Sequence, residues 1–273
     1  MRLVRFSHTA EISYGILNAS CEEITPIRGD IFGDWTRQGA RLALKDVRLR
    51  APVQPPNILA IGRNYRAHAM EFASNAQNVP LPKEPTLFIK ANTAVADPNQ
   101  TIMLPTVASK EVDYEAELVI VIGRRAHNVP EYDAKKFILG YTCGNDVTAR
   151  DRQRVDGQWA RGKSFDTFAP LGPWIETELN PDACNIQCRL NGRIMQDSNT
   201  QDLIFDTSKL VSYLSKGMTL MPGTVIMSGT PAGVGAARKP PVFLADGDVI
   251  EVEIEGIGVL RNPVANQTLR SEV

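Results

Sequence analysis

Long apolar runs, clustered basic residues and paired cysteines are all missing from this 273-residue sequence. No segment approaches the roughly 18 consecutive apolar residues of a membrane span, and the N-terminal MRLVRFSHTAEISYG lacks the apolar stretch of a signal peptide. Thirty basic residues stand against 31 acidic ones without a polybasic run, which argues against nucleic acid or an anionic membrane as a partner. None of the four cysteines forms a C-x-x-C pair, so we expect reduced thiols in a cytoplasmic protein.

The regular patterns that are present are mostly those of β-strands. Short apolar runs at 57–62 (NILAIG) and 86–91 (TLFIKA) predict strands, and VIEVEIEGIGVL (249–260) alternates as a half-buried strand with its acids on one face. Asn191-Gly192, between IQCRL and RIMQ, predicts a hairpin with a type I′ turn. Because strands dominate and do not alternate with helices, the pattern predicts a β-rich α+β fold.

Two helices and one linker complete the expected organisation. We expect helices over about 133–139 and 207–216, the second capped by Asp206 and stopped by Gly217. A proline cluster, from position 52 to 56, follows a stretch of short strands and turns. We therefore divide the chain into a small N-terminal domain, residues 1–54, and a large domain, residues 55–273.

Acidic residues in an unusual position give the first indication of function. In VDYEAELVIVIG (112–123), residues two apart share a strand face, so Asp113, Glu115 and Glu117 line up before a run that is apolar on both faces. A solvated strand face is the simpler explanation, but a strand apolar on both faces is usually covered. Half-buried carboxylates repel each other unless a cation joins them, and oxygen ligands suit magnesium or manganese. Asp146, after another apolar segment, is the candidate third ligand.

The segment GQWARGKS (157–164) satisfies the phosphate-binding P-loop pattern G-x-x-x-x-G-K-[ST]. That pattern requires a buried strand before it and a helix after it, whereas here charged RDRQRVD precedes it and Pro170 and Pro173 follow. A nucleotide-binding protein is therefore only a remote alternative. Lys163 is either a solvated loop lysine or, beside a metal, a partner for a carboxylate substrate.

Five ordered blocks resemble the fumarylacetoacetate hydrolase family, in particular its bacterial acylpyruvases and 2-hydroxyhepta-2,4-diene-1,7-dioate isomerases. The blocks are GRNYRAHAMEF (62–72), VDYEAEL (112–118), GNDVTARDRQ (144–153), GKSFDTFAPLGP (162–173) and SGTPAGVG (228–235). The resemblance covers roughly residues 55–265. It implies a catalytic domain with the family's mixed β-sandwich roll, preceded by a small β-rich domain.

The resemblance also implies roles for individual residues. Glu115, Glu117 and Asp146 match the positions of the family's three metal ligands, whereas Asp113 matches no ligand position. Substrate-binding positions match Gln153, Lys163 and Thr230, with Arg150 beside them in a supporting role, and Lys163 also counts as catalytic.

His68 and Glu71 match the pair with which hydrolytic members activate water. A lone histidine is more often structural, but Glu71 at i+3 shares its helical face and could raise its basicity. Residues 63–79 correspond to a lid, and the polar EFASNAQNVPLPKEP suits a mobile loop.

The function implied by this resemblance is divalent-metal-dependent hydrolysis of a C–C bond in an acylpyruvate-type or fumarylacetoacetate-type β-diketo acid, through a stabilised enolate. The ion is magnesium or manganese, with calcium as a third option. The same enolate would also serve an isomerase or tautomerase of 2-hydroxy-dienoates, or a decarboxylase of oxaloacetate-type acids, in aromatic catabolism. An inactive metal-binding scaffold is a further alternative. Family members are commonly dimers, so we expect a homodimer.

Overall fold

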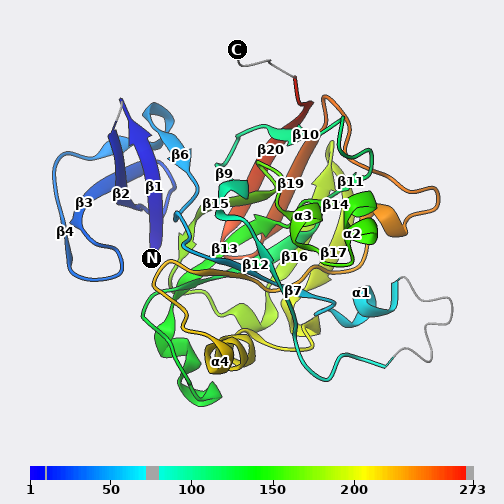
Figure 1. The fold of residues 1–273 in the computed structure, drawn as a ribbon. Helices are drawn as coiled ribbons and strands as arrows, with labels where there is room; N and C mark the ends of the chain where they lie inside the picture. Colours follow the sequence, from blue (N-terminus) through cyan, green and yellow to red (C-terminus); the bar gives the residue numbers. More distant parts are fainter. Residues whose placement is uncertain (10, 72–79, 269–273) are drawn as a thin grey trace, which may run out of the picture.

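Three β-sheets provide most of the regular structure in the computed structural model, which describes residues 1–9, 11–71 and 80–268 (Figure 1). Within those ranges the sheets have 13, five and two strands, and the helices are few and short. This is the β-rich α+β class that the sequence predicts. No helix in the described ranges is long and apolar enough to cross a membrane.

The large sheet contains the strands of the N-terminal domain at one end and those of the large domain at the other. Its main path is β4 (Trp35–Arg37), β3 (Glu23–Gly29), β2 (Glu11–Leu17), β1 (Arg2–His8), β15 (Ala169–Glu176), β13 (Ile138–Asn145), β12 (Ala116–Ile122), β18 (Val225–Met227), β7 (Ile58–Gly62) and β8 (Thr86–Lys90). Three short strands pair beside this path: β5 (Leu42–Ala43), β6 (Arg48–Arg50) and β9 (Val95–Ala96).

The second sheet has the order β10 (Ile102–Leu104), β20 (Gly258–Asn266), β19 (Val249–Ile254), β16 (Asn185–Leu190) and β17 (Arg193–Asn199), and the third pairs β11 (Val112–Asp113) with β14 (Thr148–Ala149). The predicted β16–β17 hairpin is confirmed, with positive φ at both Asn191 and Gly192. The prediction of one continuous strand over 249–260 is wrong. The chain turns at 255–257, where Gly256 has a φ of 79°, and returns as β20.

The helices are α1 (Arg66–Glu71), α2 (Arg150–Asp156), α3 (Ala160–Lys163) and α4 (Thr207–Gly217). Helix α4 confirms the predicted one, and the Asp206 side chain accepts a hydrogen bond from the Lys209 backbone N–H. The helix expected over 133–139 is instead a 3-10 helix, Glu131–Phe137, because the chain enters β13 at Ile138. Further 3-10 helices are Leu44–Asp46, Asn92–Ala94, Pro181–Ala183, Thr200–Asp202 and Gly235–Ala237.

The N-terminal strands have a small core of their own, made by Val4, Phe6, Leu17 and Ile24. They also continue the large sheet, because β1 pairs with β15 through Arg2 and Leu3. The predicted N-terminal β domain is therefore present and joined to the rest by backbone pairing. A boundary between residues 54 and 55 stays a prediction.

Strand β12 lies inside the large sheet, between β13 and β18, and every one of its residues is buried. Being apolar on both faces, it is covered on both, as expected. Helices α1, α2 and α3 lie on the side of the molecule away from β1–β4 (Figure 1). All four cysteines have free thiols; Cys143, Cys184 and Cys188 are buried and Cys21 is partly exposed.

Candidate metal and substrate site

The carboxylates come together because β12 and β13 are antiparallel neighbours. Their register sets Ala116 opposite Asn145, so the residues that flank this pair, Glu115 and Asp146, meet where the two strands end. The Asp146 backbone N–H donates to the Glu115 carbonyl at 2.8 Å, and the Glu115 N–H donates to the Asn145 side chain at 3.0 Å. Glu115 directly precedes β12 and Glu117 is the second residue of that strand, so the two side chains approach each other at this end of β12.

Glu115, Glu117 and Asp146 form a compact and buried acidic cluster. One carboxylate oxygen from each lies within 4.8 Å of those of the other two, and the residues are only 5%, 1% and 0% exposed. Three oxygen donors at this spacing suit a hard divalent ion. The arrangement is consistent with the divalent-metal site that the sequence predicts.

Asp113 does not join this cluster. The strand is interrupted at 114–115, because β11 pairs with β14 whereas β12 pairs with β13 and β18. The Asp113 carboxylate accepts hydrogen bonds from the backbone N–H groups of Gly235 and Ala236, at 2.7 and 2.9 Å. It therefore holds a neighbouring loop in place.

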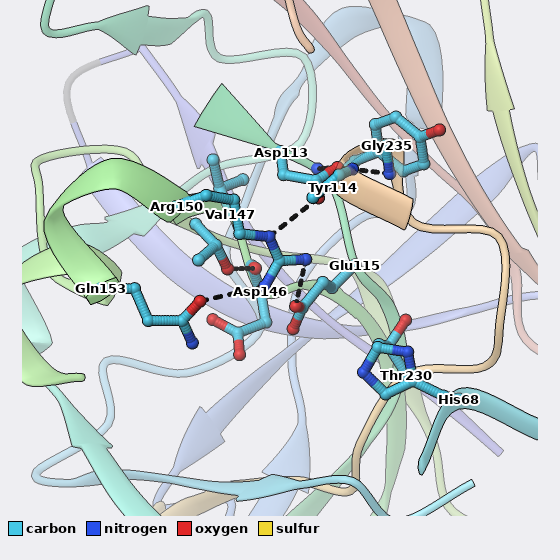
Figure 2. A network of polar contacts seen from close by, with 12 residues as sticks. His68, Asp113, Tyr114, Glu115, Asp146, Val147, Arg150, Gln153, Thr230 and Gly235 are labelled. Carbon is cyan, nitrogen blue, oxygen red and sulfur yellow. Dashed lines mark hydrogen bonds and ion pairs between the residues drawn. The ribbon is translucent and has the colours of Figure 1, made fainter. Parts of the chain in front are cut away.

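Three buried cations lie against the acids. Lys163 Nζ donates to Glu115 Oε2 at 2.8 Å and to Asp146 Oδ2 at 2.6 Å. Lys90 Nζ donates to the other oxygen of Asp146, Oδ1, at 2.5 Å. Arg150 donates to Asp113 at 2.8 Å and forms an ion pair with Glu115 at 2.7 Å (Figure 2).

Glu117 differs from the other acids because none of these three cations pairs with it. Burial would raise the pKa of Glu115, but Lys163 and Arg150 outweigh that effect and hold it well below its usual range. The pKa of Glu117 is raised, by burial and then by the charges of Asp146 and Glu115. Within the described residues Glu117 forms no ion pair, and its carboxylate accepts one hydrogen bond, from the Gly229 N–H at 2.7 Å. An unpaired buried carboxylate beside two others is what a bound divalent cation would relieve, so the donor set fits such an ion.

The two lysines respond to burial differently. Burial lowers the pKa of both ammonium groups, because it penalises the charged form. At Lys163, contact with Asp146 and Glu115 more than offsets this and raises the pKa. At Lys90, burial prevails over the contact with Asp146, and the pKa is lowered.

A cavity of about 670 Å³ opens onto the acids. Glu115 and Glu117 line it together with Lys163, and Phe88 lies against the Lys163 ammonium, with Nζ 4.9 Å from the ring centre. No described lining residue precedes Ile61, so none comes from the N-terminal domain. A volume of this size accommodates a small organic acid.

Helix α1 brings the predicted histidine–glutamate pair to the same cavity. His68 lines it, and His68 Nδ1 lies 2.8 Å from Glu71 Oε2. The other oxygen of Glu71 accepts a hydrogen bond from the Gly233 N–H at 2.6 Å, which fixes the carboxylate. This contact orients the imidazole. Of the expected lid over 63–79, positions 72–79 lie outside the described residues.

The predicted substrate-binding side chains lie around the same cavity but have different surroundings. Gln153 Oε1 accepts from Arg150 Nη1 at 3.3 Å, and Arg150 already contacts two acids, which suits its predicted supporting role (Figure 2). Thr230 Oγ1 accepts a hydrogen bond from Gln196 Nε2 at 2.8 Å, so its own hydroxyl proton remains to be donated. The metal-ligand, catalytic and binding roles stay predictions; the structure brings all of these residues to one site.

Sequence reasoning missed two residues of this site. Lys90 ends strand β8 and is fully buried against Asp146, and the one available signal was a lysine in the otherwise apolar TLFIKA. Gln196, in β17, is 1% exposed and fixes both Thr230 and the Ala116 N–H, but its sequence surroundings have no distinguishing feature.

The P-loop pattern at 157–164 has none of the required context. Helix α2 precedes it instead of a strand, and the four-residue α3 lies inside it. The Lys163 ammonium is taken up by Glu115 and Asp146.

Two family models match most of this chain. Residues 57–265 match the family model described as fumarylacetoacetate (FAA) hydrolase C-terminal, and residues 1–52 match one described as Rv2993c-like, N-terminal. The chain is 46% identical to a mitochondrial oxaloacetate tautomerase, fahd2, of Xenopus laevis over 229 residues, which is 82% of this chain and 70% of that protein.

Two solved structures cover the chain almost completely. One is a 5-carboxymethyl-2-hydroxymuconate delta-isomerase from Mycobacterium smegmatis, with 42% identity and a TM-score of 0.87. The other is a 2-hydroxyhepta-2,4-diene-1,7-dioate isomerase from Mycobacterium marinum, with 38% identity and a TM-score of 0.86. Each match covers 98% of this chain and 100% of the other.

Proposed function

Since the chain belongs to the fumarylacetoacetate hydrolase family and is an enzyme of that family, we propose that it tautomerises or isomerises a small 2-oxo or 2-hydroxy diacid. Oxaloacetate and 2-hydroxy-dienoates are the substrate types we favour. The observation that carries the proposal is that His68 lines the same cavity as Glu115 and Glu117 of the acidic cluster. The names of the similar proteins, tautomerase and isomerase, support this reaction better than the hydrolysis expected from the sequence.

The acidic cluster and its neighbours would bind the 2-oxo acid end of the substrate. A divalent cation on Glu115, Glu117 and Asp146 would act as a Lewis acid that stabilises negative charge on the 2-oxygen. We propose magnesium or manganese for this ion. Lys163 offers an ammonium and Thr230 a hydroxyl donor at the same cavity, and both suit a substrate carboxylate.

His68 would move the proton. Conversion of an enol to its keto form removes a proton from the 2-oxygen, adds one to C3, and turns the C2–C3 double bond into a C2–O double bond. A histidine oriented by Glu71 can take up the proton that leaves the 2-oxygen and deliver a proton to C3. One acid–base group is sufficient for such a transfer.

Hydrolytic C–C cleavage remains the second candidate. The same imidazole could deprotonate a water molecule, and a cavity of about 670 Å³ leaves room for an acyl group larger than a four-carbon diacid. The two reactions differ in their products, since only hydrolysis releases a second carboxylic acid.

An assay with enol-oxaloacetate in the presence of Mg²⁺ tests the proposal. We expect the enzyme to accelerate decay of the enol absorbance, and His68→Asn to remove most of that acceleration. His127→Asn is the matched control, because His127 is exposed and its imidazole contacts Asn128 beside it. Cleavage of acetylpyruvate, with no effect on enol-oxaloacetate or a hydroxymuconate-type acid, would instead establish the hydrolase.

A further inference from the structure

Two lysines share one aspartate in the acidic cluster, and each takes a different oxygen. Lys90 Nζ contacts Asp146 Oδ1 at 2.5 Å, whereas Lys163 Nζ contacts Asp146 Oδ2 at 2.6 Å. The side chains of Lys90 and Asp146 are 0% exposed, and that of Lys163 is 2% exposed. Equal charge and similar burial make the two lysines look equivalent at first.

Their surroundings separate them. Lys163 lines the cavity and also donates to Glu115, so its ammonium lies among oxygens of the proposed metal ligands. Lys90 is not among the described cavity-lining residues, and its second acceptor is the Val147 carbonyl, at 3.2 Å. Lys90 therefore approaches Asp146 from the protein side and Lys163 approaches it from the cavity side.

The backbone of Lys90 is held as well as its side chain. Lys90 pairs with Ile58 in the β7–β8 ladder. The next residue, Ala91, donates its N–H to the Ser164 hydroxyl at 2.9 Å, which ties β8 to the chain just after Lys163. A buried ammonium that moved away from its two acceptors would lose them without reaching water, a large cost. Lys90 is thus a fixed partner of Asp146.

We propose that Lys90 is a positioning residue of the metal site, which permanently occupies Asp146 Oδ1 and so presents Oδ2 to the cation. Lys163 is the exchangeable partner, which gives up Oδ2 and turns to the substrate when a cation binds. This inference rests on the proposed metal-dependent function. Hydrogen bonds that orient a ligating carboxylate typically contribute 10–100-fold to metal affinity.

A calorimetric titration of the purified enzyme with Mn²⁺ distinguishes a positioning role of Lys90 from simple charge neutralisation. We expect Lys90→Met to weaken Mn²⁺ binding by roughly 10–100-fold. Lys163→Met should bind Mn²⁺ as tightly as wild type or more tightly, because it removes a cation that competes for the same oxygens. If the two lysines only neutralised charge, both substitutions would tighten binding, since each removes one positive charge near the ion.

A second variant guards against a folding defect. Lys90→Gln keeps a polar donor but is too short to reach Asp146, and it should also weaken binding; melting of all variants in EDTA checks that they are folded. Mn²⁺ binding by either Lys90 variant at or above wild-type affinity would overturn the proposal for Lys90 alone. Wild-type enzyme that binds no Mn²⁺ would overturn the metal site itself and this inference with it.

Discussion

Replacing Glu117 by glutamine should stabilise the metal-free protein, although Glu117 belongs to the candidate active site. Its carboxylate is buried beside Glu115 and Asp146 and forms no ion pair among the described residues. Glutamine keeps the shape of the side chain and an oxygen that can accept the Gly229 N–H. The substitution therefore removes one buried negative charge and little else.

The magnitude follows from the spacing of the acids. Two unit charges 4.8 Å apart interact by about 3 kcal/mol at an effective dielectric constant of about 20. Uptake of a proton by Glu117, whose pKa is raised, limits this penalty. We therefore expect a gain of about 1–3 kcal/mol in the free energy of unfolding, and each kcal/mol corresponds to about 2–4 °C in melting temperature for a chain of this size.

Glu115→Gln is the matched control, because the same chemical change should have the opposite sign. Glu115 pairs with Lys163 and Arg150, so its loss leaves two buried cations with fewer partners. Breaking a buried ion pair costs up to about 3–5 kcal/mol, and here the cost is reduced because Asp146 and Asp113 still hold the two cations.

Thermal melting in EDTA and again in excess Mg²⁺ provides the test. In EDTA, Glu117→Gln should melt several degrees above wild type and Glu115→Gln below it. At about 100 times the dissociation constant, a bound ion stabilises the wild type by about 2.7 kcal/mol, and Glu117→Gln should lose that gain. If both variants melt lower than wild type in EDTA, or if Mg²⁺ raises all three equally, our account of the charges at this site is refuted.

Two further predictions concern the cap of helix α4 and the substrate-binding role of Thr230. Asp206→Ala removes the oxygen that accepts the Lys209 N–H at the start of α4, and denaturant unfolding should show a loss of about 1 kcal/mol; an unchanged midpoint would show that the cap contributes nothing. Thr230→Val should raise KM for the keto acid, because the Thr230 hydroxyl lies at the cavity. The loss in melting temperature should be small, because Gln196 Nε2 keeps the Pro231 carbonyl, at 2.8 Å, as an acceptor. Steady-state kinetics at saturating Mg²⁺ would contradict the binding role if KM stayed at the wild-type value.

The sequence indicated the site where acidic residues stood next to segments that had to be buried. Acids directly before a run that is apolar on both faces had to end up partly buried, and β12 is buried throughout. Asp146 was found in the same way, since it follows the apolar end of β13. The helix cap at Asp206 and the hairpin turn at Asn191-Gly192 followed from local chemistry, which acts over a few residues.

Features that depend on strand pairing could not be predicted. Asp113 and Glu115 are two residues apart and looked equivalent, yet the change of partner strand between β11 and β12 directs Asp113 to the Gly235 loop and Glu115 to the acidic cluster. The turn at 255–257 was missed for a related reason. Alternation continues through Gly256 in the sequence, and only the pairing of β19 with β20 reveals the reversal.

The buried charges of the site nearly balance, but the sequence could not show which acid pairs with which cation. Four buried acids, Asp113, Glu115, Glu117 and Asp146, face three buried cations, Lys90, Arg150 and Lys163, so with all seven groups ionised the site has one excess negative charge. The contacts between them span 56 positions for Lys90 with Asp146 and 48 for Lys163 with Glu115, so nothing local connects them. Because the three cations are taken up by the other acids, the missing positive charge falls at Glu117. A divalent ion placed there would neutralise the excess and leave one positive charge for an anionic substrate, which is why the acidic cluster and the keto-acid proposal support each other.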